Sequence, residues 1–152
     1  MQKDILIITN YFPPEKGAAA NRVFDLAKAY KNNDYKVLVL CPLPNYPKGS
    51  IFNGYKNRLV LSENIEGIEI KRLWLFASNS KNKFLRLLSM LSFGLNLFMY
   101  SLFKKTPKKV IIQCSPLFVG FFAVLISKLK HKTIILNVSD LWPLAGLQMG
   151  IL

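Results

Sequence analysis

Residues 4–22 constrain the fold more than any other part of the chain, because they place a strand, a loop and a helix start in that order. The apolar run at 4–9 predicts a buried strand. Two prolines and a glycine at 10–17 favour a loop, and a helix is expected from Ala18. In α/β proteins such a loop can hold an anion, because the free N–H groups and the dipole of the helix N-terminus face it.

The rest of the chain alternates between strand-like and helix-like segments. Apolar and β-branched runs predict further strands at 35–40, 58–62, 68–75, 110–114 and 133–138. A hairpin turn is expected at 64–67. Helical periodicity predicts helices at 18–31, 83–103 and 117–129, and 145–152 is compatible with the start of another. This order predicts one doubly wound α/β domain over residues 1–152, with a mostly parallel sheet.

The chain is strongly basic: 21 Lys and Arg against 8 Asp and Glu give a net charge of +13. Such an excess favours anionic partners, namely nucleic acid, anionic lipid or phosphorylated substrates. The lysines are scattered and no arginine cluster is present, which argues against specific reading of a nucleic acid. Cys41 and Cys114 fit no metal-binding spacing, so we expect no metal and two buried free thiols of a cytosolic protein. No secretory signal is expected at the N-terminus.

Residues 83–103 form an unusually apolar segment with a narrow polar stripe. Arg86, Ser89, Ser92, Asn96 and Tyr100 recur at helical spacing, and lysines flank the segment on both sides. Three placements stay open for this helix. It can lie in an anionic membrane surface, pack in the protein core, or span a membrane.

Ligands of doubly wound sheets bind at the carboxyl ends of the strands, where the strand order reverses. The loops at 10–17, 41–57, 114–116 and 139–143 qualify. They and the first turns that follow offer these polar candidates: Asn10, Glu15, Asn21, Arg22, Asn45, Gln113, Ser115 and Asp140. The first loop lacks both the dinucleotide fingerprint and the Walker A pattern.

For several of these residues the sequence allows either a ligand-binding role or a purely structural one. Gly17 either lets the backbone approach a diphosphate or only starts the helix. Arg22 either reaches a phosphate or is solvated. Asp140 either binds sugar hydroxyls or acts as a base, or it caps the next helix. His131, in a basic turn, is expected at the surface.

Four stretches, in this order, resemble family 4 glycosyltransferases, in particular the branch that builds bacterial capsule, O-antigen and colanic-acid-type polysaccharides and includes amino-sugar transferases. The first is IITNYFPPE at 7–15, followed by GAAANR at 17–22. The others are CPLPNYPKG at 41–49, SPLFVG at 115–120 and DLWP at 140–143.

The resemblance implies a GT-B enzyme, in which two Rossmann-like domains face each other across a cleft. This chain resembles only the N-terminal, acceptor-binding domain. It implies a retaining transferase that uses a nucleotide-sugar donor as substrate and holds no bound cofactor. The family's donor-binding features, basic residues on the diphosphate and a paired-glutamate motif, belong to the C-terminal domain and are not found in this sequence. We therefore expect the chain alone to be inactive.

The resemblance also suggests roles for individual residues. Gly17, Asn21 and Arg22 would face the donor diphosphate. The acceptor would be met by Asn45, Tyr46, Lys48 and Ser115. Asp140 would be the catalytic residue.

The implied acceptor is a polyprenyl-diphosphate-linked sugar, which places the chain at the cytoplasmic face of the cell membrane with residues 83–103 on anionic lipid. A partner chain that supplies the C-terminal domain is a further implied partner. Two other readings stay open: a subunit of a two-chain transferase, or a non-catalytic scaffold at the membrane. No specific nucleic acid partner is expected.

Overall fold

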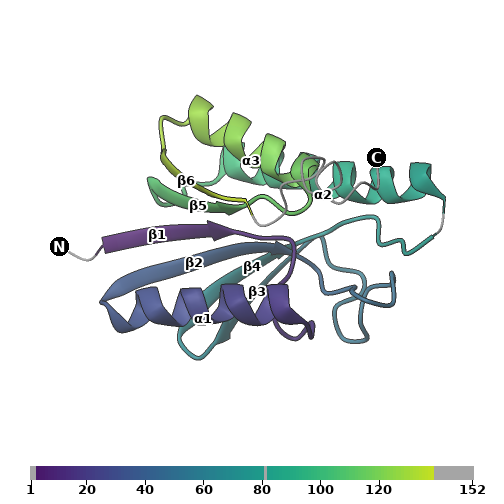
Figure 1. Cartoon of the computed structure of the whole chain (residues 1–152), viewed down its shortest axis with the longest axis horizontal. Coiled ribbons are helices and arrows are strands. Elements are labelled where there is room, and N and C mark those ends of the chain that lie inside the picture. Colours follow the sequence, from purple (N-terminus) through teal and green to yellow (C-terminus); the bar gives the residue numbers. More distant parts are fainter. Residues whose placement is uncertain (1–2, 81, 139–152) are drawn as a thin grey trace, which may run out of the picture.

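The computed structural model describes residues 3–80 and 82–138, which form a six-stranded sheet with helices on both faces (Figure 1). The strands are β1 (Lys3–Ile8), β2 (Tyr35–Pro42), β3 (Val60–Ile65), β4 (Ile68–Leu73), β5 (Lys109–Gln113) and β6 (Thr133–Asn137). The helices are α1 (Ala18–Asn32), α2 (Lys83–Phe103) and α3 (Leu117–Leu129). The strand order is β3-β4-β2-β1-β5-β6, and only the β3–β4 pair is antiparallel. The predicted doubly wound α/β fold is therefore confirmed, and it is Rossmann-like.

The order of the strands reverses beside β1. From β1 the chain passes through α1 to β2 on one side and continues to the β3–β4 hairpin. It then crosses back through α2 to β5 on the other side of β1, where Ile8 stands opposite Ile112. The carboxyl ends of β1 and β5 therefore diverge into different loops, which is the place where ligands of such sheets bind.

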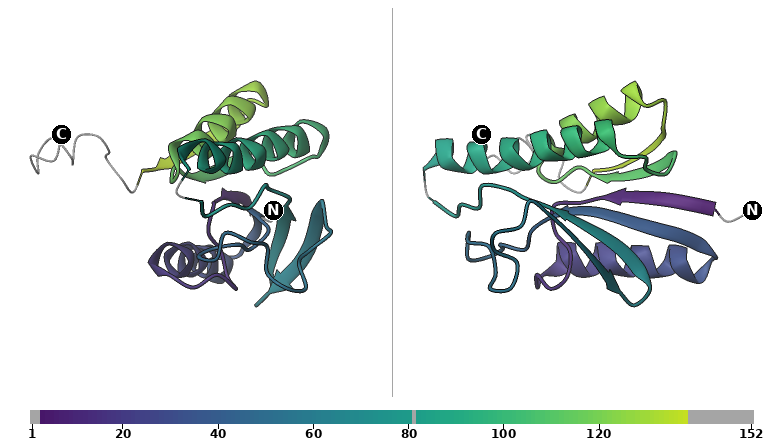
Figure 2. Two further views of the ribbon diagram at one scale, coloured as in Figure 1. Left: turned by 90° about the vertical axis from the view of Figure 1, so that its right-hand side faces the viewer. Right: turned by 180° about the vertical axis from the view of Figure 1, so that it is seen from behind.

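The alternation of side chains along the central strands divides the core into two layers. On one face, Leu6, Ile8 and Val110 pack with Phe93 and Leu97 of α2. On the other face, side chains of the same strands pack with α1, and the buried members of that cluster include Ile5, Ile7, Val23, Ala27, Val37, Val39 and Ile111. Figure 2 shows α1 below the sheet and α2 with α3 above it. Strands that are buried on both faces are the reason that the sequence runs are continuously apolar.

The predicted elements agree with the structure, with small differences at their ends. Helices α2 and α3 have the predicted bounds, 83–103 and 117–129, and α1 ends one residue later than predicted. The strand expected at 58–62 instead runs from Val60 to Ile65, because the hairpin needs only Glu66 and Gly67 for its turn. Both turn residues have positive φ, 50° and 79°, which suits a tight two-residue connection. The helix considered at 145–152 lies outside the described residues.

Helix α2 packs in the core along one side only. Phe93, Gly94 and Leu97 are buried against the sheet and α3, and Gly94 lies so close to the ring of Phe122 that a side chain there would collide with it. Part of the polar stripe contacts the segment that follows β4, where Ser92 accepts from the N–H of Phe76 and the amide of Asn96 donates to the carbonyl of Trp74. The remaining apolar side of α2 is exposed.

Two lysines between α3 and β6 donate hydrogen bonds to the end of α2 and to the segment that follows it. Lys132 donates through Nζ to the carbonyl oxygens of Thr106 and Pro107, at 3.1 and 2.6 Å, and to the hydroxyl of Thr106 at 2.6 Å. Lys130 donates to the carbonyl of Leu102 at 2.7 Å. Burial, followed by the charge of Lys130, lowers the pKa of Lys132 to about 8. His131 is exposed in the same turn, as expected.

This lowered pKa predicts a rise in stability with pH. Between about 8 and the ordinary value of 10.5, the unfolded chain keeps a proton on Lys132 that the folded chain has lost. The free energy of unfolding therefore increases over this range, and it loses this contribution below pH 8. Urea denaturation of the wild type and Lys132→Met at several pH values measures the effect. We expect the rise to be smaller in the variant; identical pH profiles would contradict the prediction.

Candidate functional site

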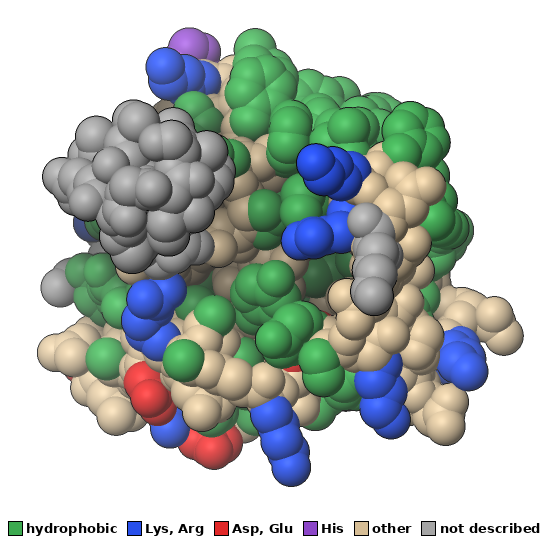
Figure 3. Space-filling model, turned by 45° about the vertical axis from the view of Figure 1, so that its right-hand side comes forward, with side chains coloured by type: hydrophobic (Ala, Val, Ile, Leu, Met, Phe, Trp, Pro, Cys, Tyr) green, Lys and Arg blue, Asp and Glu red, His purple; other side chains and the backbone are tan. Residues whose placement is uncertain are grey.

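A cleft of about 290 Å³ lies at the carboxyl edge of the sheet. The loops after β1, β2, β4 and β5 and the first turns of α2 form its walls, so it occupies the place where the strand order reverses. Figure 3 shows this side of the molecule, hollowed near its centre, with Lys and Arg side chains around the hollow. The lining residues are Asn10, Tyr11, Asn45, Tyr46, Pro47, Gly49, Leu75, Ser78, Asn79, Arg86, Ser89, Met90, Ser115 and Pro116.

The buried carboxylate of Glu15 joins the first two loops of the cleft. Its Oε1 accepts from the backbone N–H groups of Asn45 and Tyr46, at 2.8 and 2.9 Å, and its Oε2 accepts from the N–H of Phe12 at 3.3 Å. Glu15 is 3% exposed, and this burial raises its pKa even though the three N–H donors and Arg72 oppose the shift. Glu15 was a candidate for ligand binding in the sequence, but its carboxylate oxygens are used to position the loops.

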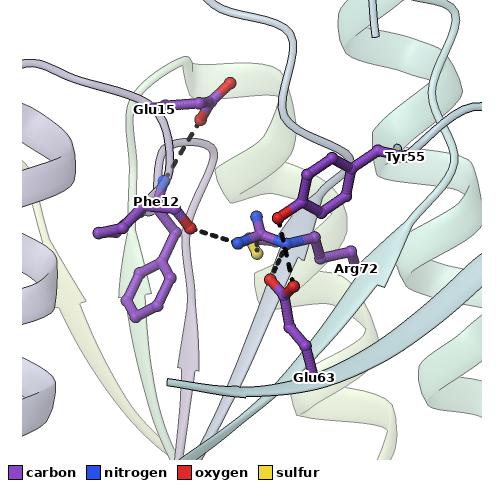
Figure 4. A network of polar contacts seen from close by, with 7 residues as sticks. Phe12, Glu15, Tyr55, Glu63 and Arg72 are labelled. Atoms are coloured by element: carbon purple, nitrogen blue, oxygen red, sulfur yellow. Dashed lines mark hydrogen bonds and ion pairs between the residues drawn. The ribbon is translucent and has the colours of Figure 1, made fainter. Parts of the chain in front are cut away.

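A second buried group, Arg72 of β4, contacts the loop after β1 and the loop after β2 (Figure 4). Its guanidinium pairs with the carboxylate of Glu63 and donates to the carbonyl of Pro13 in the first loop. It also donates to Sγ of Cys41 at 3.4 Å and lies 5.4 Å from the centre of the Tyr55 ring. Arg72 is fully buried, and a buried charge requires such partners.

Tyr46 lines the cleft and also two neighbouring hollows. Its ring packs edge to face against Tyr11 at 5.4 Å, and half of its surface is exposed. It lines the cleft, a smaller pocket of about 190 Å³ at the start of α1, and a third hollow beside Lys48. The two tyrosines give the cleft an aromatic wall with hydroxyl groups, a surface suited to the faces and hydroxyls of sugars.

The predicted donor-facing residues lie at the N-cap and in the first turns of α1, but they do not line one pocket. Gly17 lines the smaller pocket, together with Tyr11, Glu15, Lys16 and the first alanines of α1. Its φ of 149° and ψ of 162° form a conformation that only glycine adopts readily. Asn21 and Arg22 are exposed one turn later and do not line this pocket.

The predicted acceptor residues divide between two hollows. Asn45, Tyr46 and Ser115 line the cleft. Lys48 lies in the neighbouring hollow, with Lys16 and Lys56. Asp140, the predicted catalytic residue, lies outside the described residues, as does the rest of the stretch at 140–143.

The remaining polar candidates also differ in position. Asn10 lines the cleft, whereas Gln113 is buried at the end of β5, and within the described residues its Nε2 has no hydrogen-bond partner. The two cysteines are buried free thiols, as predicted. Burial raises the pKa of Cys41 to about 12.

Sequence reasoning missed three groups that shape the site. Arg72 follows Ile68 and Ile70 at a spacing of two, which puts it on the buried face that these residues share; that alternation was the available signal. Arg86 was recognised only as part of a polar stripe. Asn79 follows β4 and donates to the carbonyl of Pro47 at 2.8 Å, which links the loop after β4 to the loop after β2.

The described lining of the cleft combines neutral amides, hydroxyls and aromatic rings with the apolar side chains of Leu75, Met90 and two prolines, and its one cation is Arg86. These groups can bind a polyhydroxylated, anionic ligand through hydrogen bonds and one charge. Among residues 3–80 and 82–138, no cluster of three His, Cys, Asp or Glu side chains could hold a metal ion.

Comparison with known proteins supports the fold but not a family. No family model and no curated protein matches the chain. Among solved structures, it is similar to the C-terminal domain of a hydrogenase from Pyrococcus furiosus, with 14% identity and a TM-score of 0.55, over 89% of this chain and 90% of that one. At this identity the similarity shows a shared α/β fold and nothing further.

Loss of the Arg72 charge should loosen both loops. Arg72→Met leaves the carboxylate of Glu63 and the carbonyl of Pro13 without their partner, at a cost of about 3 kcal/mol in the free energy of unfolding. Lys71→Met is the matched control, because Lys71 pairs with Glu69 at the surface and such pairs contribute about 1 kcal/mol or less. Urea denaturation measures both variants. Equal losses would show that the burial of Arg72 does not matter.

Proposed function

We propose that the chain is the acceptor-binding half of a retaining glycosyltransferase that acts in bacterial surface-polysaccharide synthesis. The transferred sugar would come from a nucleotide-sugar, and the acceptor would be a polyprenyl-diphosphate-linked sugar at the inner face of the cell membrane. The observation that carries the proposal is the cleft at the strand-order reversal. Its amides and hydroxyls suit a sugar, and its one cation suits a phosphate.

The positions of the motif stretches add support. Residues 7–22 form the end of β1, the first loop and the start of α1, and residues 41–49 form the end of β2 and the second loop. Residues 115–120 lead into α3 from the end of β5. All three contribute to the same edge of the sheet. They are the stretches by which the sequence resembles family 4 glycosyltransferases.

A complete transfer site needs a second wall. In this proposal the described cleft binds the acceptor, and Gly17 approaches the donor diphosphate from the pocket at the start of α1. Binding of the nucleotide-sugar would depend mainly on a donor domain, in the same protein or in a partner chain.

A transfer assay tests the proposal directly. The purified chain is incubated with a panel of labelled nucleotide-sugars and polyprenyl-diphosphate-linked sugars, alone and with a donor-binding domain encoded next to it. We expect no transfer by the chain alone and transfer by the pair, with retention of the anomeric configuration. Transfer by the chain alone would contradict the claim that a separate donor domain is required. Absence of transfer by the pair with every acceptor would overturn the proposal.

The exposed apolar side of α2 and α3 supports attachment to a membrane. Phe84, Phe103 and Phe121 are 68%, 75% and 62% exposed. In Figure 3 hydrophobic side chains gather on the upper part of the molecule, the side of α2 and α3. Within the described residues, α2 is the one helix whose length and composition would let it cross a membrane, and 22% of its most apolar window is buried. Because its inner side packs on the sheet, we propose that it lies along the surface.

Lysines border this apolar side at the ends of both helices, including Lys83, Lys104, Lys105, Lys128 and Lys130. Each basic residue near anionic lipid contributes about 1 kcal/mol. Most of these lysines are exposed at the end where α2 and α3 finish. We therefore expect attachment to combine apolar insertion with attraction to anionic headgroups.

Vesicle flotation measures this attachment. The chain should bind vesicles of phosphatidylcholine with phosphatidylglycerol more strongly than pure phosphatidylcholine. A double variant, Phe84→Asp with Phe121→Asp, should bind at least tenfold more weakly, because each buried phenylalanine contributes about 1.5 kcal/mol or more. Leu59→Asp is the control, since Leu59 is 77% exposed in the loop before β3. Equal binding by the double variant and the control would contradict membrane insertion through α2 and α3.

A non-catalytic membrane scaffold is the second candidate function. The same apolar side favours it, because attachment requires no chemistry. Vesicle binding without any transfer by the pair would favour the scaffold over the transferase.

A further inference from the structure

Arg86 is the one charged residue among the described residues that line the cleft. Within the described part of the chain Arg86 belongs to none of the salt bridges, its side chain is exposed, and its charge acts on Tyr11, which lines the same cleft. The other described lining residues are uncharged, so no carboxylate of the lining offsets its charge. A cleft with one cation and otherwise uncharged walls selects a ligand with a localised negative charge.

Arg86 also lies where the cleft meets the apolar side of α2. It belongs to the first turns of the helix, and Ser89, about one turn later, lines the cleft as well. Two neighbouring positions do not line the cleft: Phe84 is 68% exposed and Leu88 is 40% exposed. The helix thus presents a guanidinium toward the cleft and large apolar side chains away from it within the same two turns.

We infer that Arg86 binds the diphosphate of the lipid-linked acceptor. The sugar of the acceptor then lies among the amides and hydroxyls of the cleft, such as Asn45 and Ser115. The hydrocarbon leaves around the start of α2 to the opposite side of the helix, where Phe84 and Leu88 are exposed. This inference rests on the proposed function, because it concerns the acceptor of that same site. It adds a positioning residue that neither the motif stretches nor the predicted site residues include.

The cleft and the pocket at the start of α1 are two separate hollows. The pocket at the start of α1 contains Gly17 but not Arg86, and the cleft contains Arg86 but not Gly17. Tyr11 and Tyr46 line both and separate them. Donor and acceptor diphosphates would therefore occupy different hollows on the two sides of one aromatic pair.

Binding of a short acceptor analogue to the whole chain tests the inference. Farnesyl diphosphate is titrated into the chain at physiological salt and compared with farnesol and with inorganic diphosphate. We expect farnesyl diphosphate to bind more tightly than either, because only it offers both the charge and the hydrocarbon. Arg86→Gln should weaken this binding about tenfold or more. Arg86→Lys should recover part of the loss, since it restores the charge without the fork of donors.

Lys83→Gln is the matched control, because it removes the same charge from the same end of α2 and Lys83 does not line the cleft. Thermal unfolding checks that all variants fold. Equal binding by wild type and Arg86→Gln would overturn the inference, as would equal losses in Arg86→Gln and Lys83→Gln. Equal affinities for farnesyl diphosphate and inorganic diphosphate would overturn the role of the hydrocarbon.

These results are independent of the transfer assay. If binding depends on Arg86 while the pair transfers no sugar, the proposed transferase fails and the diphosphate site stands. If the pair transfers sugar while Arg86→Gln binds farnesyl diphosphate normally, only the present inference fails.

Discussion

The buried guanidinium of Arg72 is the interaction on which the carboxyl edge of the sheet depends. A charge with no exposed surface is tolerated only with partners around it, and here they come from separate parts of the chain. Glu63 belongs to the edge strand β3, Pro13 to the first loop and Tyr55 to the second. Burying this one side chain obliges both loops to close over the end of β4. The walls of the cleft are therefore held by the core of the domain.

Helix α2 connects three environments that the sequence presents as one apolar segment. Its inner side completes the core through Phe93 and Leu97. Its polar stripe bonds the segment after β4 and reaches the cleft at Arg86. Its outer side, with α3, leaves a broad apolar surface bordered by lysines. A single element thus joins the proposed lipid surface to the proposed acceptor site, and both proposals depend on its orientation.

Local patterns in the sequence were sufficient for most of the fold. The bounds of α2 follow from a mostly apolar stretch with helical periodicity between Asn82 and Lys104, and those of α3 from Pro116 and a lysine-rich end. The site was harder to predict, because its contacts join distant residues. Glu15 bonds N–H groups about thirty positions further on, and no local pattern encodes that distance. Asn45, Tyr46 and Ser115 do meet in one cleft, since strand ends of a parallel sheet share an edge.

The bonds of Glu15 have a consequence for redesign of the protein. At positions 45 and 46 the carboxylate bonds the backbone N–H groups and not the side chains, so these two bonds persist for any pair of residues other than proline. Substitutions there remove the bond from the Asn45 amide to the carbonyl of Leu43 and the ring contact of Tyr46 with Tyr11, but they keep the bonds of Glu15. Natural drift can make the same substitutions, so that the specificity of the cleft diverges while these bonds are inherited unchanged.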